Sequence, residues 1–341
     1  MAQTDESGGM SPARDPLNGR LRALRLALII LPLIGLVISI AAFTYFVAGT
    51  DAALADQSFV FVTVRYFLHT LPYQALCLWA GLTMSPRPET GPKKSSLKLP
   101  RKFPVESRVI SLLKWFLIGC ALILAVIKLV HFGGAIAGWV TNLTNGGAYL
   151  LTHNAGELFI AVSFAAICIA VTRQNSGAET SRAAAVLRVA LIIIPLLAVS
   201  LTVLSSWISF IEMSLNQFDH PFTTHIEPLI IPLAYLAIGV WAAHLIKPFN
   251  GLDFETMRWS LIFLGAALPI LIIITQYQVY ESAYREHRGK PFVSYLLTGG
   301  LRSLLGGLSF GLNLLLFNLI CFFFAHKMDE AGEKKGVGYS A

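Results

Sequence analysis

The segment Leu24–Leu33, LRLALIILPL, occurs a second time as Leu187–Leu196, LRVALIIIPL. Eight of the ten positions are identical in the two copies, and the other two exchange one aliphatic residue for another. In both copies an arginine stands at the second position and a proline follows it seven residues later, inside an apolar run. We interpret the two copies as the starts of two related membrane spans, which enter the lipid from the same kind of surface.

The composition excludes a soluble globular protein. Apolar residues make up 55% of the 341 residues and charged residues only 13%, with a mean hydropathy of +0.65, whereas soluble domains carry about 25% charge. The net charge of +7 does not indicate nucleic-acid binding, because the basic residues lie in short connections between apolar runs. These features predict a polytopic membrane protein whose main partner is the lipid bilayer.

Eight apolar runs are long enough to cross a bilayer, for which about 20 residues suffice. They are Leu26–Ala48, Phe59–Met84, Val109–Phe132, Ala148–Thr172, Leu187–Met213, Pro228–Ile246, Met257–Tyr277 and Leu301–His326. The first run, with a possible cleavage site at Ala53–Ala55, also has features of a signal peptide. Its length of about 23 residues, against about 7–15 for a signal core, and its second copy in mid-chain favour a membrane helix.

Further matches extend the duplication over the whole membrane part. The third run opens with KWFLI at residues 114–118 and the seventh with RWSLI at residues 258–262, and an Ile-Cys pair recurs in the fourth and eighth runs. Four spans therefore separate each pair of matching helices. An even separation gives both halves the same orientation, so the sequence predicts a parallel repeat about an axis along the membrane normal.

The expected fold class is all-α: a polytopic transmembrane helical bundle of eight spans, built as two parallel-related four-helix units. Residues 26–172 form the first unit and residues 187–326 the second. Residues 1–25 are expected to be a disordered cytoplasmic tail, because the segment is rich in Gly, Pro, Asp and Ser. Residues 327–341 are expected to be a second cytoplasmic tail.

The distribution of Lys and Arg between the connections predicts the orientation. The tail before the first run and the connection after the second run are rich in both residues, whereas the connections after the first and third runs contain neither. Because basic connections stay in the cytoplasm, both termini are expected there, in a cytoplasmic-type (inner) membrane. Residues 278–300 depart from the rule with three basic residues, which two glutamates partly offset.

Three ionisable residues lie inside the apolar runs: Arg65, Lys128 and Glu157. A charge at the centre of a membrane helix costs roughly 2.5–3.5 kcal/mol on insertion scales, so such residues are rare and commonly functional. Counted from the predicted outer ends of their runs, they lie about 9, 6 and 14 Å deep at about 1.5 Å per residue. Glu157 is the deepest, and its short side chain does not reach water from there.

Four further polar side chains lie three or four residues from these charges on the same helices, and such spacings place side chains on one helix face. We therefore expect one ligand-binding polar site in the outer half of the first unit. It comprises Arg65, His69, Lys128, His131, His153, Asn154 and Glu157.

Three interpretations of this site stay open. Two cations facing one carboxylate leave an excess of positive charge, which favours a small anionic solute or a lipid headgroup as the ligand. Alternatively, the charges form an ion-pair network that only holds the helices together, with Lys128 and Arg65 reaching toward the interface. In the third interpretation, two of His69, His131 and His153 ligate a haem iron and the protein is an electron-transfer subunit.

The sequence contains no enzyme signature: a His-rich metal box, a GxSxG elbow and a phosphate-binding glycine loop are all absent. No catalytic residue, metal site or cofactor is assigned, which favours a non-enzymatic protein. We expect a transporter or permease-like protein for the anionic ligand above. The alternative is a non-transporting membrane subunit that anchors or assembles a larger complex, with partner subunits on the basic connection Met84–Arg108.

The predicted orientation can be tested with reporter fusions. Fusions after Thr50 and Asn142 are expected to report the outer side and a fusion after Ser95 the cytoplasmic side, because connections poor in Lys and Arg are the ones translocated. Alkaline phosphatase activity and fluorescence of a cytoplasmic reporter measure the two sides. The reverse pattern contradicts the predicted topology.

Overall fold

The computed structural model describes residues 16–48, 70–84, 104–141, 147–173, 182–215, 223–249, 251–286 and 300–336, and these residues are almost entirely helical. The all-α prediction is thus confirmed for the described part of the chain. The helices are α1 (Pro16–Ala48), α3 (Leu71–Thr83), α4 (Pro104–Thr141), α5 (Gly147–Arg173), α6 (Arg182–Leu215), α7 (Thr223–Ile246), α8 (Phe254–Glu286) and α10 (Gly300–Gly336).

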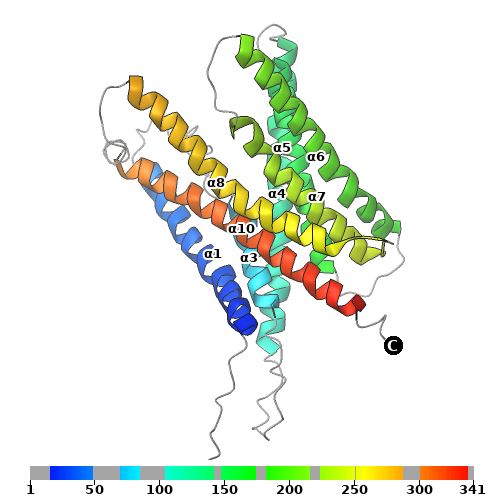
Figure 1. Ribbon diagram of the computed structural model, residues 1–341. Coiled ribbons are helices and arrows are strands. Elements are labelled where there is room, and N and C mark those ends of the chain that lie inside the picture. The colour runs from blue at the N-terminus through cyan, green and yellow to red at the C-terminus, as the bar shows by residue number, and fades with distance from the viewer. Residues whose placement is uncertain are drawn as a thin grey trace, which may run out of the picture.

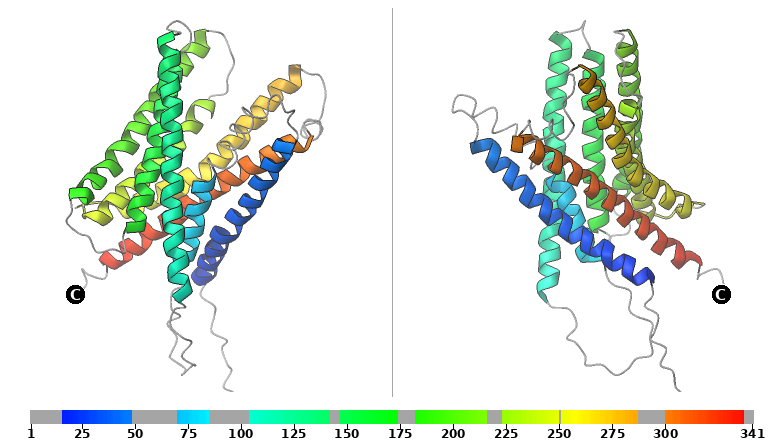
Figure 2. Two further views of the ribbon diagram at one scale, coloured as in Figure 1. Left: turned by 180° about the vertical axis from the view of Figure 1, so that it is seen from behind. Right: turned by 60° about the vertical axis from the view of Figure 1, so that its left-hand side comes forward.

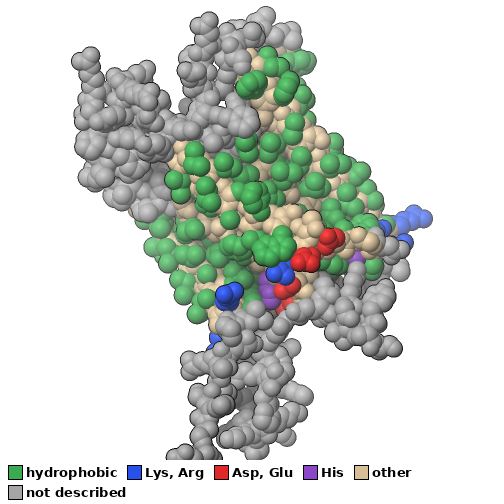
Figure 3. All heavy atoms as spheres, in the orientation of Figure 1, with side chains coloured by type: hydrophobic (Ala, Val, Ile, Leu, Met, Phe, Trp, Pro, Cys, Tyr) green, Lys and Arg blue, Asp and Glu red, His purple; other side chains and the backbone are tan. Residues whose placement is uncertain are grey.

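Seven of these helices are long and apolar enough to cross a membrane, as expected for a multi-pass membrane protein. The exception, α3, has 13 described residues, because the first part of the predicted run Phe59–Met84 lies outside the described residues. The number of eight spans therefore stays a prediction. Figure 3 shows the lipid-compatible surface: hydrophobic side chains cover most of the visible face, and charged side chains gather near the end at which α10 finishes.

The helices pack in two groups, which Figures 1 and 2 show leaning apart. In one group α5 packs against α4, α6 and α7, and in the other α10 packs against α1, α3 and α8. The groups meet where α3 contacts α4 and where α7 contacts α8. Each group thus takes two helices from each half of the sequence. The start of α1 and the end of α10 lie toward the same end of the bundle (Figure 1).

The neighbours of the first four helices match those of the last four. The helix α1 packs on α3 as α6 packs on α7, and α4 packs on α5 as α8 packs on α10. The contacts between halves match too, since α10 packs on α1 as α5 packs on α6. Two related halves would produce this scheme, but the duplication itself stays a prediction.

The two matching arginines have corresponding positions in this arrangement. Arg25 of α1 donates from Nε to the carbonyl oxygen of Gly81, near the end of α3, at 3.2 Å. The guanidinium group of Arg188 of α6 lies 4.2 Å from the ring centroid of Phe249, just beyond the end of α7. In each half a cation therefore links the first helix to the end of the second, where the helix dipole is negative.

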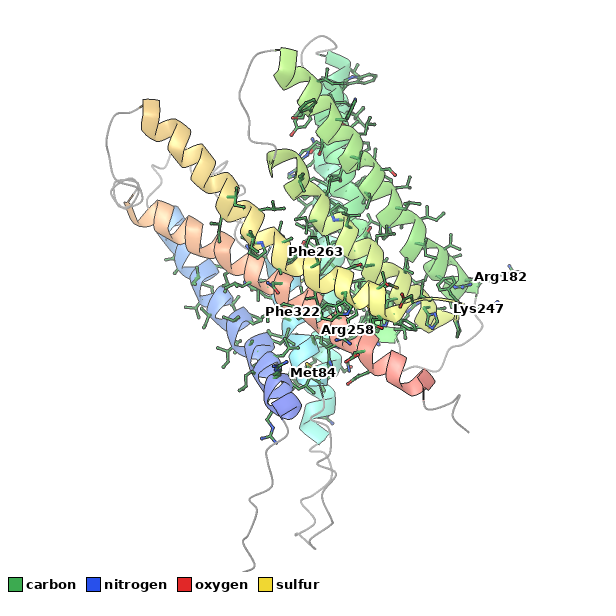
Figure 4. The ribbon with its side chains drawn as sticks, in the orientation of Figure 1. Met84, Arg182, Lys247, Arg258, Phe263 and Phe322 are labelled. Atoms are coloured by element: carbon green, nitrogen blue, oxygen red, sulfur yellow. The ribbon has the colours of Figure 1, made fainter. Side chains whose placement is uncertain are left out.

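The polar end of the second group is held by a cap and an ion pair. The carboxylate of Asp253 accepts hydrogen bonds from the backbone N–H groups of Glu255 and Thr256, at 2.9 and 3.2 Å, and from the Thr256 hydroxyl at 2.5 Å. These hydrogen bonds stabilise the ionised carboxylate and so lower the pKa of Asp253. The bond from the Thr256 hydroxyl has the largest effect. Arg258 of α8 pairs with Asp329 of α10 at 2.5 Å (Figure 4).

Small residues let the helices approach closely, as is usual where lipid supplies no hydrophobic drive for association. The tightest example is Gly239 of α7, where a Cβ would lie only 2.2 Å from the backbone oxygen of Leu191 on α6. Gly156 of α5 faces α6 in a similar way, with Thr202 Oγ1 3.3 Å from the position of its missing Cβ. These contacts bring α5, α6 and α7 together around the site described below.

Gly239→Ala is expected to destabilise the protein by about 1–3 kcal/mol, because the added methyl group forces α7 away from the backbone of α6. Thermal unfolding in detergent measures the effect as a lower Tm. Gly119→Ala on α4 is the matched control, since no heavy atom lies within 4 Å of the position of its Cβ. The control should keep the Tm or raise it slightly, because Ala favours helix over Gly. Equal Tm values for the two variants contradict the close approach.

Candidate functional site

A cavity of about 270 Å³ lies within the group formed by α4, α5, α6 and α7. Side chains of all four helices line it, and Tyr73 of α3 reaches it from the other group. Its wall on α5 extends from Tyr149 to Phe164, which is about 22 Å along the axis at about 1.5 Å per residue. The cavity therefore lies in the half of the bundle that contains the end of α4 and the start of α5.

An ion pair between Lys128 of α4 and Glu157 of α5 forms part of this wall. Lys128 Nζ donates to Glu157 Oε2. The lysine side chain is 13% exposed and the glutamate side chain 37% exposed, so the carboxylate faces the cavity more openly than the ammonium group does. Each charge needs a partner at this depth, because an unpaired charge in a medium of low dielectric constant is costly.

One face of α5 carries most of the polar wall. Tyr149, His153 and Glu157 follow one another at four-residue spacing and all line the cavity. The rings of Tyr149 and His153 are stacked, with centroids 5.5 Å apart and planes inclined by 18°. A stacked aromatic pair thus lies one and two helical turns from the carboxylate, toward the start of α5.

A row of hydroxyl groups on α6 forms the wall that adjoins this face of α5. Thr202, Ser205, Ser206 and Ser209 all line the cavity, at the spacing that places side chains on one helix face. Thr202 donates its hydroxyl hydrogen to the carbonyl oxygen of Ala198 at 2.8 Å. Ser205 and Ser206 have no hydrogen-bond partner among the residues that the structure describes. This row was not predicted from the sequence, although hydroxyl residues three or four positions apart on a helix indicate a polar face.

Two aromatic side chains of the cavity wall, Tyr73 and Phe164, pack with a third ring, Tyr235. Tyr235 of α7 donates its hydroxyl to the hydroxyl oxygen of Tyr73 of α3 at 2.9 Å. Phe164 of α5 packs against both, with ring centroids 5.1 Å from Tyr73 and 5.8 Å from Tyr235. Each tyrosine stands six residues before a buried tryptophan, Trp79 or Trp241, so the two phenols have corresponding places in the two halves.

The structure separates the predicted site residues. Lys128, His153 and Glu157 line the cavity, whereas His131 and Asn154 line a second hollow on the α4–α5 hairpin. Each of these two residues stands three positions from a member of the ion pair, which turns it about 60° around the helix axis.

Asn154 donates from Nδ2 to the carbonyl oxygen of Leu150 at 2.7 Å, within its own helix. Arg65 and His69 lie outside the described residues, so their place in the site stays a prediction. No group of three or more His, Cys, Asp or Glu side chains is arranged to hold a metal ion within the described part of the chain.

Comparisons with protein families, curated proteins and solved structures give no match. The function is therefore inferred from the cavity and the side chains that line it.

The hydrogen bond between the two phenols can be measured with a double-mutant cycle. Tyr73→Phe and Tyr235→Phe are each expected to lower the free energy of unfolding by about 1 kcal/mol, because each removes one partner of a buried hydrogen bond. The double variant should lose less than the sum of the two, with a coupling of about 0.5–1.5 kcal/mol.

Reversible unfolding in detergent supplies these free energies. Tyr149→Phe is the control, since the Tyr149 hydroxyl has no hydrogen-bond partner among the described residues, and it should change the stability little. Additive losses at Tyr73 and Tyr235 would show that the two hydroxyls do not interact.

Proposed function

We propose that the protein is a transporter or permease-like protein for a small anionic solute or a lipid headgroup, and that the cavity beside Lys128 and Glu157 is its binding site. The observation that carries the proposal is the space in front of Glu157. An ion pair that only holds two helices together is enclosed by packing, whereas this carboxylate is 37% exposed and lines a cavity.

The size and lining of the cavity support a small polar ligand. A volume of about 270 Å³ lies near the lower end of the range of about 300–1,000 Å³ that is usual for small-molecule sites. The wall combines apolar side chains with a few polar groups, which is the composition of sites that bind and orient small molecules. The cation, the hydroxyl row and a histidine supply donors for an anionic group.

The position of the cavity between halves supports a transport role. Its wall combines α4 and α5, from the proposed first unit at residues 26–172, with α6 and α7, from the proposed second unit at residues 187–326. Transporters built from repeats commonly bind substrate at the interface between repeats. The matching helix neighbours support the proposed duplication. In the proposed orientation, with both termini in the cytoplasm of an inner membrane, the cavity lies in the outer half.

The two other interpretations have less support. For a non-transporting anchor subunit, the docking surface is the basic connection Met84–Arg108, of which residues 85–103 lie outside the described part of the chain. A packed bundle without a cavity at Glu157 would have favoured that interpretation. For a haem site, the structure describes only the His131–His153 pair, and these two side chains line different hollows. The pairs that include His69 lie outside the described residues.

Loss of the carboxylate is expected to affect both stability and transport. Glu157→Gln leaves Lys128 without the charge of its partner, so the free energy of unfolding should fall by about 2 kcal/mol. Removing one partner of a fully buried ion pair costs about 3–5 kcal/mol, and the loss here is smaller because Glu157 is partly exposed. Uptake into proteoliposomes, measured with a panel of small solutes that carry an anionic group with or without an ammonium group, should fall at least about tenfold, which is about 1.4 kcal/mol.

A second variant separates a binding site from a structural ion pair. Glu157→Gln combined with Lys128→Met removes both charges and should recover the stability, because no buried charge is left unpaired. Its uptake should stay low if the pair binds the ligand. Glu255→Gln, at an exposed position in the first turn of α8, is the control for loss of a carboxylate and should behave as the unaltered protein. Recovery of uptake by the double variant would show that the pair only joins α4 to α5.

A further inference from the structure

We infer that the ligand is zwitterionic: its ammonium group binds Glu157, and its anionic group binds Lys128 and the serine hydroxyls of α6. The inference rests on the proposed function and specifies the substrate class of the same site. The chemistry is that of a small amino-phosphate or amino acid, or of a phospholipid headgroup that contains an ethanolamine group.

The ion pair itself sets this requirement. A ligand that carries only an anionic group gains Lys128 as a partner but takes the lysine from Glu157, which is then left with a reduced counter-charge. A ligand that carries only an ammonium group binds Glu157 and leaves Lys128 with a reduced counter-charge. Because a charge that loses part of its counter-charge in a site of low dielectric constant is destabilised, both single-charge ligands bind at a disadvantage. A ligand with both an ammonium group and an anionic group gives each protein charge a new partner.

One wall of the cavity offers hydrogen-bond donors to an anionic group, and another offers a carboxylate and aromatic rings to a cation. The hydroxyl row of α6 faces the cavity with Ser205 and Ser206, which have no hydrogen-bond partner among the described residues. Hydroxyl hydrogens are suitable donors to phosphate or carboxylate oxygens. Together with Lys128 these serines offer three donors to one anionic group.

The other part of the wall suits a cation. Glu157 is the more exposed member of the ion pair, so its carboxylate is accessible to an incoming ammonium group. The stacked rings of Tyr149 and His153 lie on the same face of α5, one and two turns away. The face of a tyrosine ring attracts an ammonium group by a cation–π interaction. A cation that enters from the start of α5 therefore meets the aromatic pair and then the carboxylate.

The inference is tested with a zwitterion and its two single-charge fragments. The full chain is placed in nanodiscs of phosphatidylglycerol, and its Tm is measured with phosphoethanolamine, methyl phosphate or ethanolamine at equal concentration. We expect phosphoethanolamine to raise the Tm by about 5 °C at saturation and the two fragments to raise it by less than about 1 °C.

A second set of nanodiscs distinguishes a free solute from a lipid headgroup. If nanodiscs that also contain phosphatidylethanolamine raise the Tm without added solute, and free phosphoethanolamine then adds nothing, the headgroup of the lipid is the ligand. If free phosphoethanolamine raises the Tm and the lipid does not, the ligand is a soluble zwitterion. Either result supports the inference, because the same ammonium and anionic groups are recognised.

Substitutions within the pair should change the selectivity in opposite directions. In Glu157→Gln the ammonium group loses its partner, so methyl phosphate should shift the Tm as much as phosphoethanolamine does. In Lys128→Gln the anionic group loses its main partner, so ethanolamine should become equal to phosphoethanolamine. Lys114→Gln removes a cation from the other end of α4 and should keep the selectivity of the unaltered protein. These are differences between ligands within one variant, so a general loss of stability does not mimic them.

Two outcomes overturn the inference and differ in what they leave standing. If methyl phosphate shifts the Tm of the unaltered protein as much as phosphoethanolamine does, the ligand is a simple anion. The zwitterion inference is then wrong and the proposed function stands. If no soluble probe and no lipid shifts the Tm, both the inference and the proposed binding site are wrong.

Discussion

A carboxylate in apolar surroundings needs a partner, and in this protein Glu157 has one on the neighbouring helix. Lys128 lies on α4 and reaches the carboxylate on α5, so the pair requires one rotation and one register of these two helices relative to each other. The same register brings Tyr149 and His153 of α5 to the cavity. The electrostatic requirement of this partly exposed acid thus helps to determine which side chains of the α4–α5 hairpin line the site.

Two glycines at helix contacts determine how closely α6 and α7 pack beside the site. Gly156 admits Thr202 to within ordinary contact, and Gly239 admits the backbone of Leu191. A side chain at either position would separate the helices and widen the cavity, since protein interiors relax only partly around added bulk. The hydroxyl row of α6 and the ion pair line the same cavity. Packing and electrostatics therefore define the same cavity from two sides.

Hydropathy alone was sufficient to predict the membrane class and most of the spans, because the requirement for about 20 apolar residues acts along the chain. It placed Lys128 about 6 Å and Glu157 about 14 Å deep by helix rise, and the structure pairs the two side chains. It did not predict that His131 and Asn154 face another hollow. The rotation of each helix about its axis depends on the packing of its neighbours, and a step of three residues is enough to cross from one wall to the next.

The two phenols that join α3 to α7 have a mechanical consequence. Tyr73 belongs to the group of α1, α3, α8 and α10, and Tyr235 belongs to the group of α4 to α7. Their hydrogen bond therefore joins the two groups. If one group rocked against the other, it would break this bond, which is worth about 1 kcal/mol net. That is little more than the thermal energy RT of about 0.6 kcal/mol. The bond would therefore add little to the barrier for such a movement, and Tyr73, which lines the same cavity as Glu157, would lose its partner.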